Sequence, residues 1–342
     1  MFFTWSFIRL FSYYFRSFLL LALCMLLRKW KRKTYLKMNQ WKRKTYLEIN
    51  LLFLFILCNC STLTVPLTLQ NSPLHCLNFV GASALTYKYS MELQELMAKL
   101  AELYERGRYK PPDCIAQQKV AIIIAFRNRH EHLKHWLYYL HPILERQQLD
   151  YGVYIINQDG EGVFNRAKLM NVGFVEALKE YDYDCLVFSD IDLVPMDDRN
   201  LYRCFQNPRH LSVAIDKFNF QLPYGTNFGG VISLSKSQFL KINGFSNTFW
   251  GWGGEDDDIY QRVIFHGMSI SRPDLVKGKY KMIKHVRDLH NEQNPVNAGK
   301  LRHTKSTMNK DGINSLKYTV KETVKDILYT WITVDIQAPL TT

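Results

Sequence analysis

Two apolar stretches near the N-terminus flank a basic segment. The first, within residues 17–27, is short for a membrane span, whereas the second, at 49–69, has roughly the ~20 residues that a span requires. The Lys and Arg residues between them favour a cytosolic location for residues 1–48 and a non-cytosolic location for everything after residue 70. We therefore predict a signal-anchor transmembrane helix at 49–69. A cleavable signal peptide is the alternative, but no clear small-residue cleavage site follows the stretch.

Beyond this anchor the hydrophobic pattern changes to that of a folded domain. Residues 70–117 are expected to form a stem and lead-in, and residues 118–336 a single α/β domain. Continuous apolar runs in that domain are typical of buried parallel strands, and stretches with helical spacing separate them. The strands are expected at 119–126, 151–157 and 185–188, with helices at 132–146 and 167–178. This alternation predicts a parallel sheet that binds its ligand at the carboxyl ends of the strands.

The distribution of charge argues against nucleic-acid binding by the folded part. The chain of 342 residues has a formal net charge of +13. Its first 50 residues hold 11 of the 44 Lys and Arg but only one of the 31 Asp and Glu, which leaves +3 for the remainder. The basicity therefore belongs to the N-terminal segment, and the folded part lacks the excess positive charge of a polyanion-binding domain.

Four cysteines follow the predicted anchor: Cys76, Cys114, Cys185 and Cys204. An even number of cysteines outside the cytosol favours disulfide bonds. Sequence alone allows three pairings of the four.

Two carboxylates follow directly after the third predicted strand. Asp190 and Asp192 are alternate residues, so in an extended segment both can face one point at the carboxyl end of the sheet. Paired carboxylate oxygens there suit a divalent cation that bridges a diphosphate. Arg127, Arg129 and Arg166 follow other strands towards the same edge, where their forked donors could bind phosphate. Loop acids and surface salt bridges are the alternative for each residue taken singly.

Residues 249–258 combine tryptophans, glycines and four consecutive carboxylates. The carboxylates precede a stretch with helical spacing, where they would meet the positive end of the helix dipole. Glycines allow close approach of the backbone to a ligand, and tryptophan faces stack on sugar rings. An acidic helix start beside a glycine loop is the alternative without a ligand. Met282 and His285 supply a further thioether and imidazole, which matter only if the fold brings them to Asp192.

These runs together resemble the β-1,4-galactosyltransferase family, glycosyltransferase family seven. The matching runs are 126–129, 164–169, 188–192, 228–230, 250–258, 282–285 and 311–316, within about residues 76–336. The resemblance implies a GT-A, Rossmann-like catalytic domain on the lumenal side of a single-pass type II Golgi membrane protein. It implies Mn²⁺-dependent, inverting transfer from UDP-galactose or UDP-N-acetylgalactosamine to the 4-hydroxyl of terminal N-acetylglucosamine on glycoproteins or glycolipids.

The resemblance also assigns residues to roles. It implies that Asp192, Met282 and His285 hold the metal and that Asp256 is the general base. It places these residues at the nucleotide sugar: Ala125, Phe126, Arg127, Asn128, Arg129, Phe164, Asn165, Arg166, Ile191, Asp192, Asn227 and Trp252. It places these at the acceptor: Gly254, Glu255, Asp256, Asp257 and Asn297. Implied disulfides join Cys76 to Cys114 and Cys185 to Cys204. The Trp252 loop, and a second segment at about 282–302, would close over the donor.

Four positions depart from the family pattern. Ala125 replaces a usual proline, and Asn227 replaces the tyrosine of galactose-specific members, which leaves room for an N-acetyl group on the donor. Asn297-Ala298 replaces an Arg-Phe pair at the acceptor. The donor is therefore expected to be galactose, N-acetylgalactosamine or both. The alternative function is a non-catalytic lumenal or surface carbohydrate-binding protein on the same fold.

Overall fold

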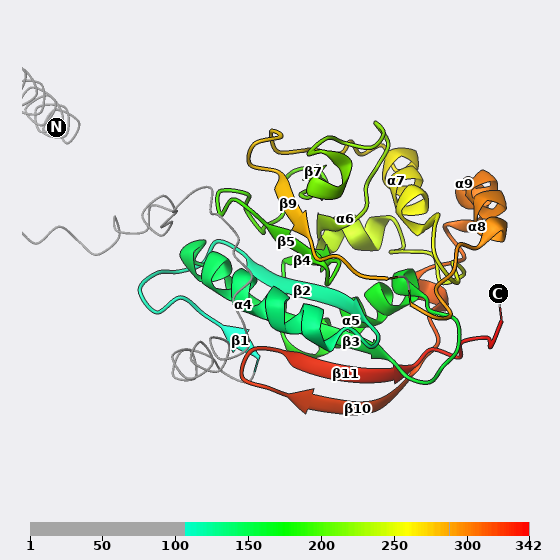
Figure 1. Cartoon of the computed structure of the whole chain (residues 1–342), viewed down its shortest axis with the longest axis horizontal. Helices are drawn as coiled ribbons and strands as arrows, with labels where there is room; N and C mark the ends of the chain where they lie inside the picture. The colour runs from blue at the N-terminus through cyan, green and yellow to red at the C-terminus, as the bar shows by residue number, and fades with distance from the viewer. Residues whose placement is uncertain (1–106, 287, 342) are drawn as a thin grey trace, which may run out of the picture. The chain divides into compact units, whose positions relative to one another are not determined.

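The computed structural model describes residues 107–286 and 288–341 (Figure 1). The predicted anchor, the basic segment, most of the stem and Cys76 lie outside these residues and stay predictions. Within the described part, no helix is both long and apolar enough to cross a membrane.

An eight-stranded mixed sheet forms the centre of the domain. Its strands run in the order β10-β11-β3-β2-β4-β8-β6, and β1 also pairs with β3. Their bounds are β1 (Arg108–Tyr109), β2 (Lys119–Phe126), β3 (Asp150–Gln158), β4 (Cys185–Ser189), β6 (Arg209–His210), β8 (Val231–Ser235), β10 (Thr319–Lys325) and β11 (Thr330–Asp335). The strand β1 lies in the stretch expected as stem and lead-in.

The three predicted strands are confirmed, but the expectation of a parallel sheet holds only for part of it. β2, β3, β4 and β11 are mutually parallel where they pair, and Ile122 lies between Val153 and Val187. β1, β6, β8 and β10 join antiparallel. Antiparallel neighbours need no helical crossover, so the alternation of strands and helices in the sequence could not predict them. Figure 1 shows one such connection, the β10–β11 hairpin, in which every residue of β10 is exposed.

The helices cover both faces of the sheet. Their bounds are α4 (His130–Arg146), α5 (Arg166–Glu180), α6 (Lys236–Lys241), α7 (Glu255–Phe265), α8 (Pro295–Lys300) and α9 (Thr304–Thr307), with 3₁₀ turns at Asp216–Phe218, Leu301–His303 and Ile313–Ser315. Ile122 packs in one core cluster with α4, and its neighbour Ile123 in another with α5. This split follows from the alternation of side chains along a strand. The helices predicted at 132–146 and 167–178 are thus confirmed.

A small second sheet brings together three distant segments. It has the order β5-β9-β7, with β5 (Leu193–Pro195), β7 (Ala214–Ile215) and β9 (Lys279–Met282). Leu193 pairs with Met282 across it. This pairing puts the end of β9 beside the acidic pair that follows β4. Strands of two to four residues carry no clear periodicity, so the sequence did not predict them.

One of the two implied disulfides is present. Cys185, the first residue of β4, is bonded to Cys204. The pairing of Cys76 with Cys114 stays a prediction because Cys76 lies outside the described residues.

Candidate active site

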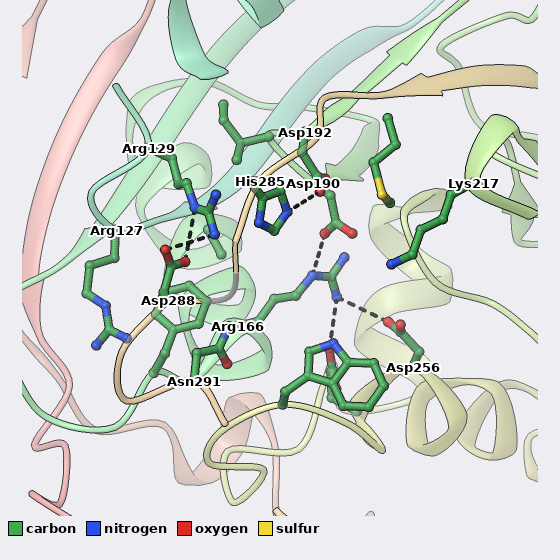
Figure 2. A pocket seen from close by; sticks show the side chains of 16 residues that line it. Arg127, Arg129, Arg166, Asp190, Asp192, Lys217, Asp256, His285, Asp288 and Asn291 are labelled. Carbon is green, nitrogen blue, oxygen red and sulfur yellow. Dashed lines mark hydrogen bonds and ion pairs between the residues drawn. The ribbon is translucent and has the colours of Figure 1, made fainter. Parts of the chain in front are cut away.

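The polar residues that follow the parallel strands surround one cavity of about 400 Å³ (Figure 2). Arg127 and Arg129 follow β2, Arg166 begins α5 after β3, and Asp192 follows β4. The cavity is lined by Ala125, Arg127, Arg129, Phe164, Arg166, Asp190, Ile191, Asp192, Lys217, Trp252, Glu255, Asp256, Met282, His285, Asp288 and Asn291. The carboxyl edge of the parallel strands is therefore the place where the predicted chemistry comes together.

Asp192, His285 and Met282 lie together on one side of this cavity. His285 Nε2 lies 2.8 Å from Asp192 Oδ2, and this contact raises the pKa of His285. The backbone N–H of Ile283 donates to Asp192 O at 2.8 Å, which fixes the end of β9 against the acidic pair. No group of three His, Cys, Asp or Glu side chains within the described residues is arranged to hold a metal. A cation here would have one carboxylate, one imidazole and a thioether as protein donors, which leaves positions for phosphate oxygens.

Arg166 connects the acidic groups at the floor of the cavity. Its Nε donates to Asp190 Oδ1 at 2.6 Å, and its Nη1 donates to Asp256 Oδ1 at 3.2 Å (Figure 2). Burial raises the pKa of Asp190 and of Asp256 to about 6 and that of Glu255 to about 7, although Arg166 opposes the shift. A carboxylate with a raised pKa is a better proton acceptor than one in water.

Gly229 allows Asp256 to sit where it does. A Cβ atom at residue 229 would lie 2.2 Å from Asp256 Oδ2, so only glycine leaves room for that carboxylate. Gly254, at the start of α7, has φ of +93°, which favours glycine. The sequence indicated Gly229 only as part of a matching run and gave it no role.

Residues 286 and 288–297, here called the cover segment, lie over the two arginines after β2. Arg127 donates to Leu289 O at 2.9 Å and to Gly162 O at 2.6 Å. Arg129 pairs with Asp288 at 2.8 Å and donates to Val286 O at 2.9 Å (Figure 2). The arginine donors are thus held by the cover segment, and a phosphate or a uracil edge would compete for them.

Two asparagines attach the cover segment to residues 249–254, here called the tryptophan loop. Asn294 Nδ2 and Asn297 Nδ2 both donate to Trp250 O, at 3.0 Å and 3.1 Å, and Asn297 Nδ2 also donates to Gly253 O at 2.8 Å. The backbone N–H of Trp252 donates to Glu292 O at 2.8 Å, while the indole side chain lines the cavity and is half exposed. The two segments expected to close over a donor are therefore joined to each other.

Comparisons with known proteins agree with this geometry. The family model described as the N-terminal region of glycosyl transferase group 7 matches residues 72–205, and the model described as the N-terminal domain of galactosyltransferase matches 209–286. β-1,4-Galactosyltransferase 1 of Mus musculus is 59% identical over 277 residues, which are 81% of this chain and 68% of the relative. The chain belongs to the β-1,4-galactosyltransferase family. β-1,4-Galactosyltransferase 2 of Homo sapiens is 58% identical over 261 residues, 76% of this chain and 70% of the relative.

Solved structures agree with this family and its GT-A fold. The catalytic domain of Drosophila β-1,4-galactosyltransferase 7, in complex with xylobiose, superposes with a TM-score of 0.56 at 26% identity. The match covers 64% of this chain and 94% of that one. A mutant of the same Drosophila enzyme was crystallised with manganese, UDP-Gal and xylobiose, and it superposes with a TM-score of 0.55.

The family's acidic run separates into different environments in this chain. Glu255 and Asp256 line the cavity, and Asp257 accepts a hydrogen bond from Tyr224 at 3.1 Å outside it. Asp258 is buried and pairs with Arg262 Nε at 2.6 Å, while Thr304 donates to it at 2.7 Å. All four carboxylates lie in the first turn of α7, as the helix-start interpretation predicted. One run therefore contains both site residues and a residue that stabilises the fold.

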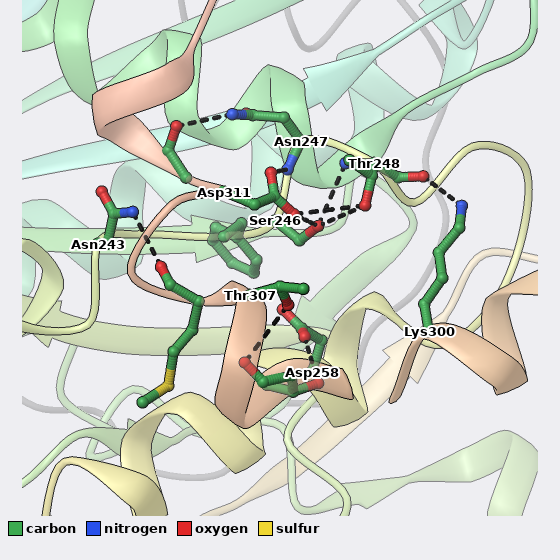
Figure 3. Close-up of polar contacts among 12 residues, drawn as sticks. Asn243, Ser246, Asn247, Thr248, Asp258, Lys300, Thr307 and Asp311 are labelled. Carbon is green, nitrogen blue, oxygen red and sulfur yellow. Dashed lines mark hydrogen bonds between the residues drawn. The ribbon is translucent and has the colours of Figure 1, made fainter. Parts of the chain in front are cut away.

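A polar network holds residues 246–248, which lead into the tryptophan loop, in place (Figure 3). Asp311 accepts hydrogen bonds from Ser246 Oγ and from the Asn247 N–H, the latter at 2.9 Å. Lys300 Nζ donates to Thr248 O and to Asn297 Oδ1. The family run at 311–316 therefore acts on the site through residues 246–248 and does not line the cavity.

Several residues that the family resemblance assigned to the site do not line the cavity: Phe126, Asn128, Asn165, Asn227, Gly254, Asp257 and Asn297. Asn165 is buried and caps α5, since its side chain accepts from Lys168 N. Asn227 lies in a turn, where its N–H donates to Tyr224 O and its carbonyl accepts from Arg272. Asn297 is buried with its amide on backbone carbonyls.

Three lining residues were not predicted: Lys217, Asp288 and Asn291. Lys217 lies in a 3₁₀ turn, and the other two lie in the irregular cover segment. None has a local pattern that would reveal it.

Proposed function

We propose that this protein catalyses inverting transfer of galactose or N-acetylgalactosamine from a UDP-sugar to the 4-hydroxyl of a terminal N-acetylglucosamine. The observation that carries the proposal is the meeting of Asp192, His285 and Met282 with three arginines and Asp256 around one cavity. A family relative crystallised with manganese, UDP-Gal and xylobiose supports a UDP-sugar donor and a sugar acceptor.

The proposed cofactor is Mn²⁺, held by Asp192, His285 and Met282. The Asp192 carboxylate is a hard oxygen ligand of the kind that suits manganese. His285 and Met282 would add a nitrogen and a sulfur ligand, and the remaining positions would be left for phosphate oxygens of the donor. When bound, the ion supplies Lewis-acid stabilisation of the negative charge on the departing diphosphate.

The chain's own residues would provide orientation and proton transfer. Arg127 and Arg129 would bind the nucleotide once their guanidinium N–H groups are released from the cover segment. Asp256 would accept the proton of the acceptor 4-hydroxyl as that oxygen forms a bond to the anomeric carbon from the face opposite UDP. The bond from the anomeric carbon to the phosphate oxygen breaks, and UDP leaves with the bonding electrons. The cover segment and Trp252 would exclude water, which would otherwise hydrolyse the donor.

The donor sugar is proposed to depend on residue 227. Asn227 does not line the cavity, whereas the larger tyrosine of galactose-specific relatives would extend further from this turn, so the asparagine should leave room for a donor with an N-acetyl group. We expect Asn227→Tyr to shift the ratio of kcat/KM towards UDP-Gal by about tenfold or more, as one displaced group in a pocket is worth ~1–3 kcal/mol. Side-by-side turnover of the two donors measures this ratio, with Asn207→Tyr as a control outside the cavity. An unchanged ratio would remove residue 227 from donor selection.

The proposed setting is the lumenal side of the Golgi membrane, with the helix at 49–69 as the anchor. Protease added to intact Golgi vesicles should then leave residues 107–341 protected until detergent is added. Digestion without detergent would refute the topology.

The decisive experiment measures UDP release by the full chain. We expect release from UDP-Gal or UDP-GalNAc only when N-acetylglucosamine and Mn²⁺ are both present, with loss on adding EDTA and recovery on restoring Mn²⁺. Binding of N-acetylglucosamine without UDP release from either donor would instead favour the non-catalytic carbohydrate-binding function.

A further inference from the structure

A second cavity, of about 550 Å³, adjoins the active site. It shares Lys217, Met282 and His285 with the first cavity, and its remaining lining residues are Asp216, Lys281 and Lys284. Three of its six lining residues are lysines. The proposed transfer gives no role to Lys281 or Lys284.

The single carboxylate of this cavity is already engaged. Lys281 Nζ pairs with Asp216 Oδ2 at 3.0 Å, and Asp216 Oδ1 accepts the N–H of Met282 at 2.9 Å. Lys217 and Lys284 are exposed, and neither forms an ion pair with another of the described residues. Their ammonium donors are therefore available to an external anion.

Lys217 joins the two cavities. Its amine points into the active-site cavity between Asp190 and Asp256 (Figure 2), yet the same residue lines the second cavity. The diphosphate of a donor would already meet Arg127 and Arg129. An acceptor whose hydroxyl reaches Asp256 must extend its other substituents away from that floor, and Lys217 marks a path for them into the second cavity.

We propose that the second cavity binds an acidic substituent of the acceptor glycan through Lys217, Lys281 and Lys284. The shared chemistry is a sulfate, phosphate or carboxylate, and the assignment rests on the proposed transferase function. The cavity falls in the range of about 300–1,000 Å³ that small ligands occupy, so it accommodates a charged group with part of its sugar ring. Lysine is a flexible point charge without a fixed fork, which suits anions of differing shape.

The test compares four acceptors with the full chain, Mn²⁺ and a saturating UDP-sugar. These are N-acetylglucosamine, its 6-sulfate, its 6-phosphate, and N-acetylglucosamine linked to glucuronic acid. At least one acidic acceptor should have a kcat/KM about three- to tenfold above the neutral one, in line with a few partly exposed charge-assisted contacts. The preference should shrink as salt rises. Its pattern among the three acids identifies the source of the anion.

Variants then locate the preference. Lys284→Gln should abolish most of it while turnover of neutral N-acetylglucosamine stays close to wild type, and Lys284→Arg should restore it. Lys277→Gln is the matched control, since Lys277 pairs with Asp274 outside both cavities. Equal kcat/KM for neutral and acidic acceptors would overturn the inference and leave the transferase function intact. A rise in the KM of the UDP-sugar with the neutral acceptor in Lys284→Gln would also overturn it, because the cavity would then serve the donor. Absence of turnover with every acceptor would instead refute the proposed function.

Discussion

The two sides of the active-site cavity are built by different forces. One side, here called the framework wall, consists of Arg166, Asp190, Asp192 and Asp256. Asp190 and Asp192 follow a buried strand, and Arg166 and Asp256 lie in the first turn of helices that pack against the sheet. The other side is the cover segment, which is irregular up to α8 and held by hydrogen bonds from side chains to backbone carbonyls.

This difference makes the framework wall hard to move and the cover segment easy to release. Moving the framework wall would require separating the apolar layers of the core, which costs far more than a few hydrogen bonds. Releasing the cover segment requires only that a small set of donors find other partners, and a bound phosphate offers such partners. A transferase needs both properties, because its carboxylates must stay fixed while substrates enter and leave.

The largest effect is expected from the framework wall itself. Asp256→Asn should lower kcat by about 10²–10⁴-fold, the usual contribution of a general base, because the amide cannot accept the hydroxyl proton. The asparagine oxygen can still accept the hydrogen bond from Arg166, so the fold should persist. Single-turnover kinetics and circular dichroism measure the two quantities, with Asp182→Asn, an exposed acid, as control. A folded Asp256→Asn enzyme with wild-type kcat would remove the base assignment.

The next effect concerns the stability of α7, the helix that carries Asp256 of the framework wall. Arg262→Met should reduce the free energy of unfolding by about 3–5 kcal/mol, because it leaves the buried Asp258 carboxylate without its cation. Urea denaturation measures the change. Lys236→Met, which removes an exposed pair with Asp182, should cost less than about 1 kcal/mol. Similar losses in both variants would show that the buried pair contributes no more than a surface one.

The cover segment should respond locally. Asn297→Asp removes the donor to Trp250 O and Gly253 O and places a charge near those carbonyls, so the segment should open more easily by about 1–3 kcal/mol. Hydrogen exchange of the amides at 292–297 should accelerate by roughly five- to a hundredfold while the strand amides of β2 remain protected. Asn309→Asp, at an exposed position, serves as control. Unchanged exchange would mean that other contacts hold the segment.

The smallest effect is on the pH profile. Because burial raises the pKa of Asp256 to about 6, kcat/KM should be level above pH 7 and fall about tenfold per unit below pH 6, as the base becomes protonated. Asp190 and Glu255 titrate nearby, so the measured value belongs to the group. In Asn297→Asp, water entering the cavity should move this limb to lower pH, because less desolvation lowers a carboxyl pKa. A profile level down to pH 5 in the wild type would contradict the raised pKa.

The framework wall could be predicted from sequence because regular structure has a regular pattern. The apolar run at 119–126 and the acids after 185–188 sufficed to place Arg127 and Asp192 at one sheet edge, and β2 and β4 have nearly the predicted bounds. The antiparallel strands were missed, since their pairing depends on loops whose lengths carry no such signal.

The cover segment could be named but its contacts could not be predicted. Asn297 was expected at the acceptor on family resemblance, whereas its amide binds the tryptophan loop. Lys217 and Asp288 reach the cavity from irregular segments, and their positions follow from tertiary packing alone. The pairing of Leu193 with Met282, which brings Met282 and His285 to Asp192, joins short strands without periodicity.

Among the described residues, β10 forms an outer edge of the main sheet, and this has a consequence for behaviour at high concentration. Every side chain of β10 faces solvent, and Lys321, Glu322 and Lys325 interrupt its apolar positions. Lys325 forms an ion pair with Glu180 at 3.1 Å. A strand of another molecule that paired with β10 would have to desolvate these charges, which is unfavourable. The bulge between Val320 and Glu322 also distorts the strand edge, which would have to be regular for another strand to pair with it. The β10–β11 hairpin thus opposes edge-to-edge aggregation of the protein at high concentration.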